Sequence, residues 1–165
     1  MNYLKGIIFI TLILVLSRII PHPPNFTPIL AGIIFLPFIK KDLTFSVIVP
    51  LAAMLISDLI IGMHSLMLWT YGSIMFLSCL TYYFNQDNIL RIGSLAVISP
   101  MIFFLVSNFG VWITGSYYAR DISGLMECYF NAIPFYASSA ISCMLFTALF
   151  YFIRSTLLKR NFLLS

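Results

Sequence analysis

Apolar stretches separated by short polar segments follow one another along the whole chain. Of its 165 residues, 61% are hydrophobic and 8% are charged, whereas about 25% charge is usual in a soluble domain. A helix of about 20 apolar residues crosses a hydrocarbon core of about 30 Å, and it satisfies its own backbone hydrogen bonds while doing so. The chain therefore predicts an all-α fold: one integral membrane bundle, a single domain over residues 1–165.

Six apolar stretches predict six transmembrane helices. Pro21, Pro23 and Pro24 end the first, because proline lacks a hydrogen-bond donor and disfavours helix in the residue before it. The second stretch has only 13 residues and so reaches about 20 Å. Either the proline-rich segment enters the membrane against protein, or the bundle is thin there. The predicted spans are approximately residues 4–20, 27–39, 43–61, 65–84, 92–113 and 128–153, with a loop over 114–127 and a basic tail after the last.

Lysine and arginine residues are distributed unevenly between the two ends of these spans. Only Arg18 and Arg120 fall at one end. The other end holds Lys5, Lys40, Lys41, Arg91, Arg154, Lys159 and Arg160. Because basic residues collect on the cytoplasmic side, we expect a multi-pass protein of the cell (inner) membrane with both termini in the cytoplasm. Basic residues that flank apolar spans face the lipid bilayer, so no nucleic-acid partner is expected.

Polar side chains that are costly in a membrane gather at the opposite, outer ends of the spans. A charged residue within a span costs a few kcal/mol and therefore needs a partner. Arg18 and Asp58 are predicted to lie at similar depth on the first and third spans, so we expect them to pair or to share a water-filled cavity. The cluster comprises Arg18, His22, Asn25, Asp58, His64, Asn108, Arg120, Asp121, Glu127 and Asn131.

Two rows of residues at helical spacing combine aromatic and polar side chains. Residues at i, i+4 and i+8 share one face of a helix. The rows are Phe104, Asn108 and Trp112 on the fifth span and Glu127, Asn131 and Phe135 at the start of the sixth. A pocket built from both rows would stack a flat ring and bind its edges by hydrogen bonds. The alternative is that the aromatic rings are bundle core and that the polar groups are merely capped.

Several segments resemble a family of uncharacterised bacterial six-span membrane proteins that are described as transporters. Two segments are quite specific: residues 18–28 read RIIPHPPNFTP, and residues 57–64 read SDLIIGMH. The others are residues 107–112, 124–129 and 133–136. The family is in turn similar to the substrate-binding S components of energy-coupling factor (ECF) vitamin transporters.

This resemblance implies an ECF S-component-like bundle that takes up a small, water-soluble, vitamin-like compound through a site at the outer membrane face. It also implies partners, namely a transmembrane scaffold and two cytoplasmic ATPase subunits. The chain itself contains no nucleotide-binding motif. The matched motifs imply the substrate-binding residues Arg18, His22, Asn25, Asp58, His64, Asn108, Trp112, Glu127 and Asn131.

Two other functions stay open at this point. A membrane-embedded enzyme would use His22, His64, Asp58 or Glu127, with at least two of them within hydrogen-bond reach. A non-transporting assembly subunit would have no cavity at its outer end and would seal Arg18 and Asp58 in a dry ion pair. No catalytic motif occurs, and two isolated histidines are weak support for a metal site, so we expect no catalytic residues, no cofactor and no metal.

Overall fold

The computed structural model describes residues 3–164, with side chains over residues 7–156. This part of the chain forms six α-helices, which confirms the all-α prediction. They are α1 (Tyr3–Ile19), α2 (Ile29–Ile39), α3 (Leu43–Ile61), α4 (Met67–Phe84), α5 (Ile89–Thr114) and α6 (Ile122–Leu164).

Three of these helices are long and apolar enough to cross a membrane. They are α3, α5 and, over its residues Ile122–Thr156, α6. The described part of α1 and the whole of α2 are shorter apolar helices. The composition of the chain and these three helices therefore favour a membrane protein.

The beginning of α6 differs from the sequence prediction. We predict a loop over residues 114–127, but the helix begins at Ile122 and the loop is correspondingly shorter. The reason is a helix cap, since the side chain of Asp121 accepts a hydrogen bond of 2.8 Å from the backbone N–H of Gly124. The predicted tail after residue 153 is also helical, as far as Leu164. The helical residues within 157–164 are described by their backbone only.

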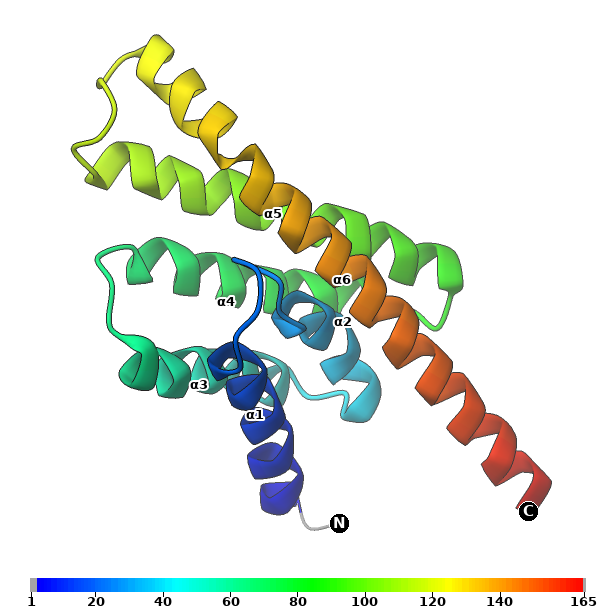
Figure 1. Cartoon of the computed structure of the whole chain (residues 1–165). Helices are drawn as coiled ribbons and strands as arrows, with labels where there is room; N and C mark the ends of the chain where they lie inside the picture. Colours follow the sequence, from blue (N-terminus) through cyan, green and yellow to red (C-terminus); the bar gives the residue numbers. More distant parts are fainter. Residues whose placement is uncertain (1–2, 165) are drawn as a thin grey trace.

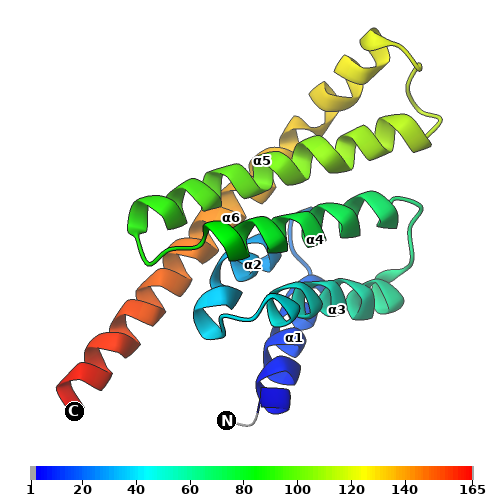
Figure 2. The ribbon, with the colours of Figure 1, turned by 180° about the vertical axis from the view of Figure 1, so that it is seen from behind.

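Helices α3, α4 and α5 lie side by side with alternating direction, as Figures 1 and 2 show. Helix α6 crosses them obliquely and packs against α5 and α2, while α1 is inclined against α3. We call the end where α3 joins α4 and α5 joins α6 the His64 end. The opposite end, where α2 joins α3 and α4 joins α5, is the Lys40 end. Arg154 of α6 lies at the Lys40 end, where its guanidinium forms a bidentate pair with Asp87 at 2.7 and 2.8 Å.

Helix α2 is the centre of the bundle. Its residues from Ile29 to Pro37 are all buried, and it packs against α3, α4, α5 and α6. Pro37 has no N–H to donate to the carbonyl of Ile33, one turn earlier. The hydroxyl of Thr81 on α4 donates to that carbonyl instead, at 3.2 Å. A proline is therefore tolerated in the core because a neighbouring helix supplies the missing donor.

The proline-rich segment 20–28 packs against the middle of α6. The ring of Phe26 lies 6.0 Å from that of Phe146, and the hydroxyl of Ser142 donates to the carbonyl of Asn25 at 3.5 Å. Asn25 has a left-handed backbone with φ of 62°, a conformation that asparagine adopts more readily than most residues. The segment therefore contacts protein on one side, while Pro23, Pro24 and Asn25 remain exposed.

Candidate polar site at the His64 end

Arg18 and Asp58 form an ion pair between α1 and α3, as predicted. Arg18 Nη2 lies 2.8 Å from Asp58 Oδ1, and the Asp58 side chain is only 2% exposed. Arg18 Nη1 also donates to the hydroxyl of Ser57 at 2.5 Å and to the carbonyl of Met54 at 3.2 Å. A buried charge needs both a counter-charge and hydrogen bonds, and this arginine has both.

The second carboxylate oxygen of Asp58 is also occupied. The hydroxyl of Tyr71 on α4 donates to Oδ2 at 2.8 Å. His64 Nε2 lies 3.6 Å from the same oxygen, and the His64 side chain is about one-third exposed. The carboxylate of Asp58 is thus surrounded by protein groups, and its structural effect is to hold Arg18 in place.

Arg18 lines a cavity of about 280 Å³ between the end of α1, the start of α2 and segment 20–28. His22, Asn25 and Thr27 contribute further polar groups. The two ring nitrogens of His22 face the carbonyls of Pro23 and Arg18, at 2.7 and 3.2 Å. The remaining lining is apolar apart from Ser139 and includes Met54, Ile74 and Phe103. We call this the first cavity.

A second cavity of about 310 Å³ lies between α4, α5 and α6. Its polar lining consists of uncharged side chains: Asn25, Thr70, Ser107, Asn108, Tyr118 and Asn131. Phe103 and Phe135 supply aromatic walls. The amides of Asn108 on α5 and Asn131 on α6 therefore meet in one cavity, as the two helical rows predict.

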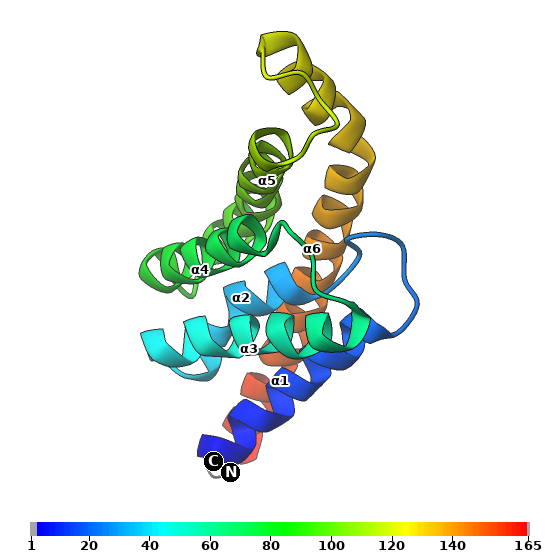
Figure 3. The same ribbon diagram turned by 90° about the vertical axis from the view of Figure 1, so that its left-hand side faces the viewer.

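The two cavities are neighbours, because Asn25 and Phe103 line both. Figure 3 views the bundle from the His64 end, and segment 20–28 runs beside α6 between α1 and α2. This segment carries Asn25 to the boundary between the cavities. The bundle is thus hollowed at the end where the sequence concentrates its polar residues.

Several polar groups around the second cavity have spare hydrogen-bonding capacity. Within the described part of the chain, the side chains of Asn25, Asn131 and Tyr118 make no hydrogen bond to protein. Asn108 uses one N–H, which donates to the carbonyl of Phe104 at 2.8 Å, and its amide oxygen stays available. These groups offer both donors and acceptors to a ligand and no net charge.

Four of the expected site residues do not line either cavity: Asp58, His64, Trp112 and Glu127. Trp112 instead fixes the α5–α6 loop, because its Nε1 donates to the carbonyl of Ala119 at 2.8 Å. Arg120 donates to the carbonyls of Trp112 and Gly115 from the same loop. Glu127 is exposed on α6.

The aromatic residues of the two rows also separate. Phe104 packs against Tyr129 and Tyr136 of α6, with ring centroids 5.4 and 5.0 Å apart. Phe104 is only partly buried and lies at the contact between α5 and α6, away from both cavities. Phe103, one position earlier, is the ring at the cavities, and the sequence pattern gave no signal that distinguishes it from the other phenylalanines of α5.

Of the four residues that an enzyme would use, His64 and Asp58 approach each other, at 3.6 Å. Neither lines a cavity in which a substrate could meet the pair. Over the residues that the structure describes, no three His, Cys, Asp or Glu side chains gather in a way that could hold a metal ion.

Comparison with known proteins assigns the chain to a protein family. A family model matches residues 2–163, and its description is a family of unknown function (DUF6580). No curated protein and no solved structure matches the chain.

Proposed function

Since the chain belongs to a family of unknown function over almost its whole length, we propose from its own geometry that it is a membrane protein for solute uptake. In this proposal the paired cavities at the His64 end bind a small, water-soluble, vitamin-like compound on the outer side of the membrane. The six helices are the six transmembrane segments of the proposal, and both termini lie in the cytoplasm.

The orientation follows from the basic side chains. Lys40, Lys41, Arg91 and Arg154 lie at the Lys40 end, whereas Arg18 and Arg120 lie at the His64 end. Arg18 is neutralised by Asp58, and Arg120 donates hydrogen bonds to the carbonyls of Trp112 and Gly115. The positive-inside rule therefore supports a cytoplasmic Lys40 end and cavities that open to the outside.

The observation that carries the proposal is the lining of the second cavity. Its amides and hydroxyls are uncharged, several of them have no protein partner, and aromatic rings flank them. Small-molecule sites commonly combine a mostly apolar enclosure with a few polar groups that fix the ligand's orientation. This cavity suits a neutral compound that carries both hydrogen-bond donors and acceptors.

The energy for uptake comes from partners in this proposal. The sequence has no nucleotide-binding motif. Its resemblance to S components of ECF transporters supports a scaffold protein and two ATPase subunits as those partners. Contact with the scaffold would favour one conformation of the bundle over another and so release the compound inward.

The test begins with the full chain extracted in mild detergent. Small molecules that co-purify with the wild type are identified by mass spectrometry, and their binding and cellular uptake are then measured for Asn131→Ala and Asn108→Ala. Each substitution removes polar atoms from the second cavity, and a lost hydrogen bond of about 1.4 kcal/mol weakens binding about tenfold.

Glu127→Ala is the matched control, because Glu127 is an exposed residue one helical turn from Asn131 on α6 and lines neither cavity. We expect it to bind and transport like the wild type. The proposal is wrong if no compound is retained and cells expressing the protein take up no member of a vitamin panel. It is also wrong if the Asn131 and Glu127 variants lose binding equally.

A further inference from the structure

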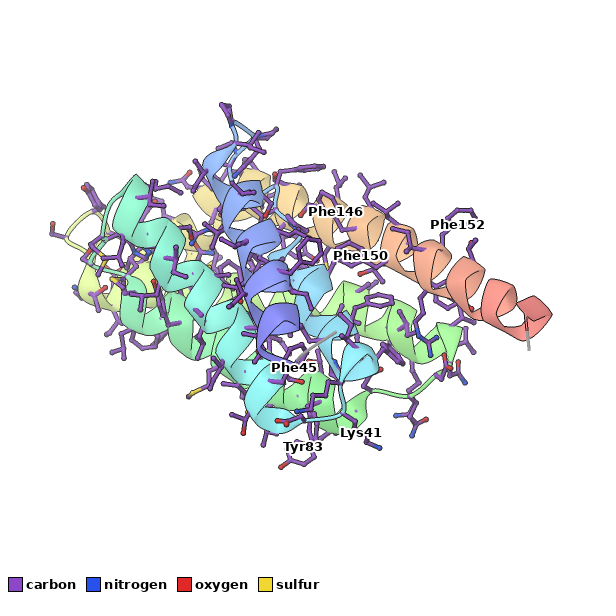
Figure 4. The ribbon with its side chains drawn as sticks, turned by 90° about the horizontal axis from the view of Figure 1, so that it is seen from below. Lys41, Phe45, Tyr83, Phe146, Phe150 and Phe152 are labelled. Carbon is purple, nitrogen blue, oxygen red and sulfur yellow. The ribbon has the colours of Figure 1, made fainter. Side chains whose placement is uncertain are left out.

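An apolar groove runs along the bundle toward the Lys40 end, between α1, α2 and α6. Its volume is about 500 Å³, and its lining includes Ile10 and Ile13 of α1, Phe35 and Leu36 of α2, and Phe150 and Ile153 of α6. The groove lies where α1, which packs mainly against α3, diverges from α2 and α6. Figure 4 views this side of the molecule and shows Phe150 on α6 and Lys41 beyond the end of α2.

A polar cavity of about 330 Å³ lies at the Lys40 end itself, and we call it the polar cavity. Lys41, Tyr82, Asn85 and Gln86 contribute polar side chains to it. The amide oxygen of Asn85 is buried and accepts no hydrogen bond from the described residues. Its amide nitrogen is already used, since it donates to the carbonyl of Ile34 at 3.2 Å. The amide oxygen has almost no accessible surface, so the polar groups that an occupant would meet are the side chains of Lys41, Tyr82 and Gln86.

The groove and the polar cavity meet at Phe38, which lines both. The guanidinium of Arg154 lies 4.5 Å from the centre of the Phe38 ring and pairs with Asp87 of the polar cavity. The surface thus changes from apolar to polar over one residue, which is the pattern that an amphipathic molecule requires.

The charge of this region favours an anion. Arg154 is neutralised by Asp87, and Lys40 lies 2.9 Å from a carboxylate oxygen of Asp42. Lys41 is exposed and forms no ion pair with the described residues, so its positive charge is uncompensated beside the polar cavity. A basic pocket between helices on the cytoplasmic side is a typical site for a phospholipid head group.

We infer that this end of the protein binds one anionic glycerophospholipid of the phosphatidylglycerol type. One acyl chain lies in the apolar groove, the phosphate lies beside Lys41, and the glycerol hydroxyls form hydrogen bonds with Tyr82 and Gln86. The site is separate from the cavities at the His64 end and rests on the proposed function only for the cytoplasmic placement of the Lys40 end. Phosphatidylcholine has no head-group hydrogen-bond donor and no net negative charge, and it fits this site less well.

The experiment measures the melting temperature (Tm) of the full chain in detergent with added phosphatidylglycerol, phosphatidylcholine or inorganic phosphate. A ligand that binds the folded state raises Tm. We expect phosphatidylglycerol to raise it more than the other two. Lys41→Gln should weaken the apparent affinity about fivefold, the factor that one basic residue contributes beside an anionic lipid, and Lys41→Arg should preserve it.

Two further variants separate the parts of the site. Arg91→Gln removes the same charge from the same end, but Arg91 lines neither the groove nor the polar cavity, so it should respond like the wild type. Ile13→Trp, at a half-exposed groove position, should reduce the effect by filling the groove. Equal stabilisation by both lipids, equal stabilisation by inorganic phosphate, or equal losses in the Lys41→Gln and Arg91→Gln variants would each overturn the inference.

Discussion

The guanidinium of Arg18 contacts the carboxylate of Asp58 at 2.8 Å and so joins the last turn of α1 to the last turn of α3. Helix α1 packs mainly against α3, and this contact fixes the end of α1 from which segment 20–28 continues. The first cavity is therefore positioned by an ion pair whose acid faces protein on every side. The ion pair affects the first cavity by holding the side chain of Arg18 at its wall.

Breaking this pair should destabilise the protein strongly. Asp58→Asn leaves the guanidinium of Arg18 without a counter-charge, and removing one partner of a buried pair costs about 3–5 kcal/mol. Replacing both residues, as Arg18→Met with Asp58→Leu, should restore much of that stability, since hydrophobic substitutes for a buried pair are often neutral. Thermal unfolding in detergent measures both. An Asp58→Asn variant as stable as the wild type would contradict the prediction.

The contact between α4 and α5 should not tolerate a methyl group at Gly110. A Cβ there would lie 2.2 Å from Trp69 Cγ and 2.6 Å from Trp69 Cβ, so Gly110→Ala should cost about 1–3 kcal/mol through overpacking. Gly72→Ala is the matched control in α4, because a Cβ at Gly72 has no neighbour within 4 Å. Alanine favours helix over glycine by about 1 kcal/mol, so the control should be neutral or stabilising in the same unfolding assay.

The hydroxyl of Thr81 should contribute to stability through the carbonyl of Ile33. Thr81→Val keeps the shape of the side chain but leaves that buried carbonyl without its donor, at a cost of about 1–3 kcal/mol. Thr11→Val is the comparison, since the Thr11 hydroxyl is buried and has no partner within the described residues. Its removal should be neutral or stabilising. Equal effects of the two substitutions would show that the bond between α4 and α2 is unimportant.

The Asp87–Arg154 pair should contribute a small, pH-dependent term. The hydrogen bonds from Arg154 lower the pKa of Asp87 below its ordinary value. The pair therefore stabilises the folded protein above the ordinary pKa of the acid, and this contribution is lost as pH falls through the lowered pKa. Because the Asp87 side chain is mostly exposed, Asp87→Asn should cost only about 0.2–1 kcal/mol at neutral pH.

Measuring Tm of the wild type and of Asp87→Asn between pH 7 and pH 3 tests this sign. The difference should shrink toward the acidic end and also at high salt, which screens exposed pairs. A difference that grows as the pH falls would contradict the assignment.

The sequence predicts most helix positions and the ion pair between Arg18 and Asp58, for physical reasons. Prolines and polar turns end apolar stretches at defined residues, and a charged side chain in an apolar bundle requires a partner at its own depth. Helical spacing places Asn108 and Asn131 each on a face with aromatic residues, and the packing of α5 against α6 brings both to the second cavity. Spacing assigns a residue to a face of its own helix, however, and does not say which neighbour that face meets. For this reason Trp112, which binds the α5–α6 loop, and Glu127, which is exposed, were expected at the site.

Other features depend on contacts between segments distant in sequence. The helix cap from Asp121 is a local sequence signal for the start of α6. The prediction followed the apolar pattern instead and therefore began the last span too late. Phe38 joins the apolar groove to the polar cavity, and Asn25 is shared by the first and second cavities. Both arrangements depend on the packing of several helices, and no single stretch of sequence contains them. The central position of α2 is of the same kind, because an all-apolar helix can be buried in protein or exposed to lipid.

That central position separates α2 from the constraints that shape the other helices. A helix in contact with lipid must match the thickness of the bilayer, whereas α2 meets protein along nearly its whole length. In the proposed six-span arrangement, membranes with shorter or longer fatty acids should therefore change the tilt of the outer helices more than that of α2. Substitutions in α2 should be governed by side-chain volume, as they are in the interior of a water-soluble enzyme.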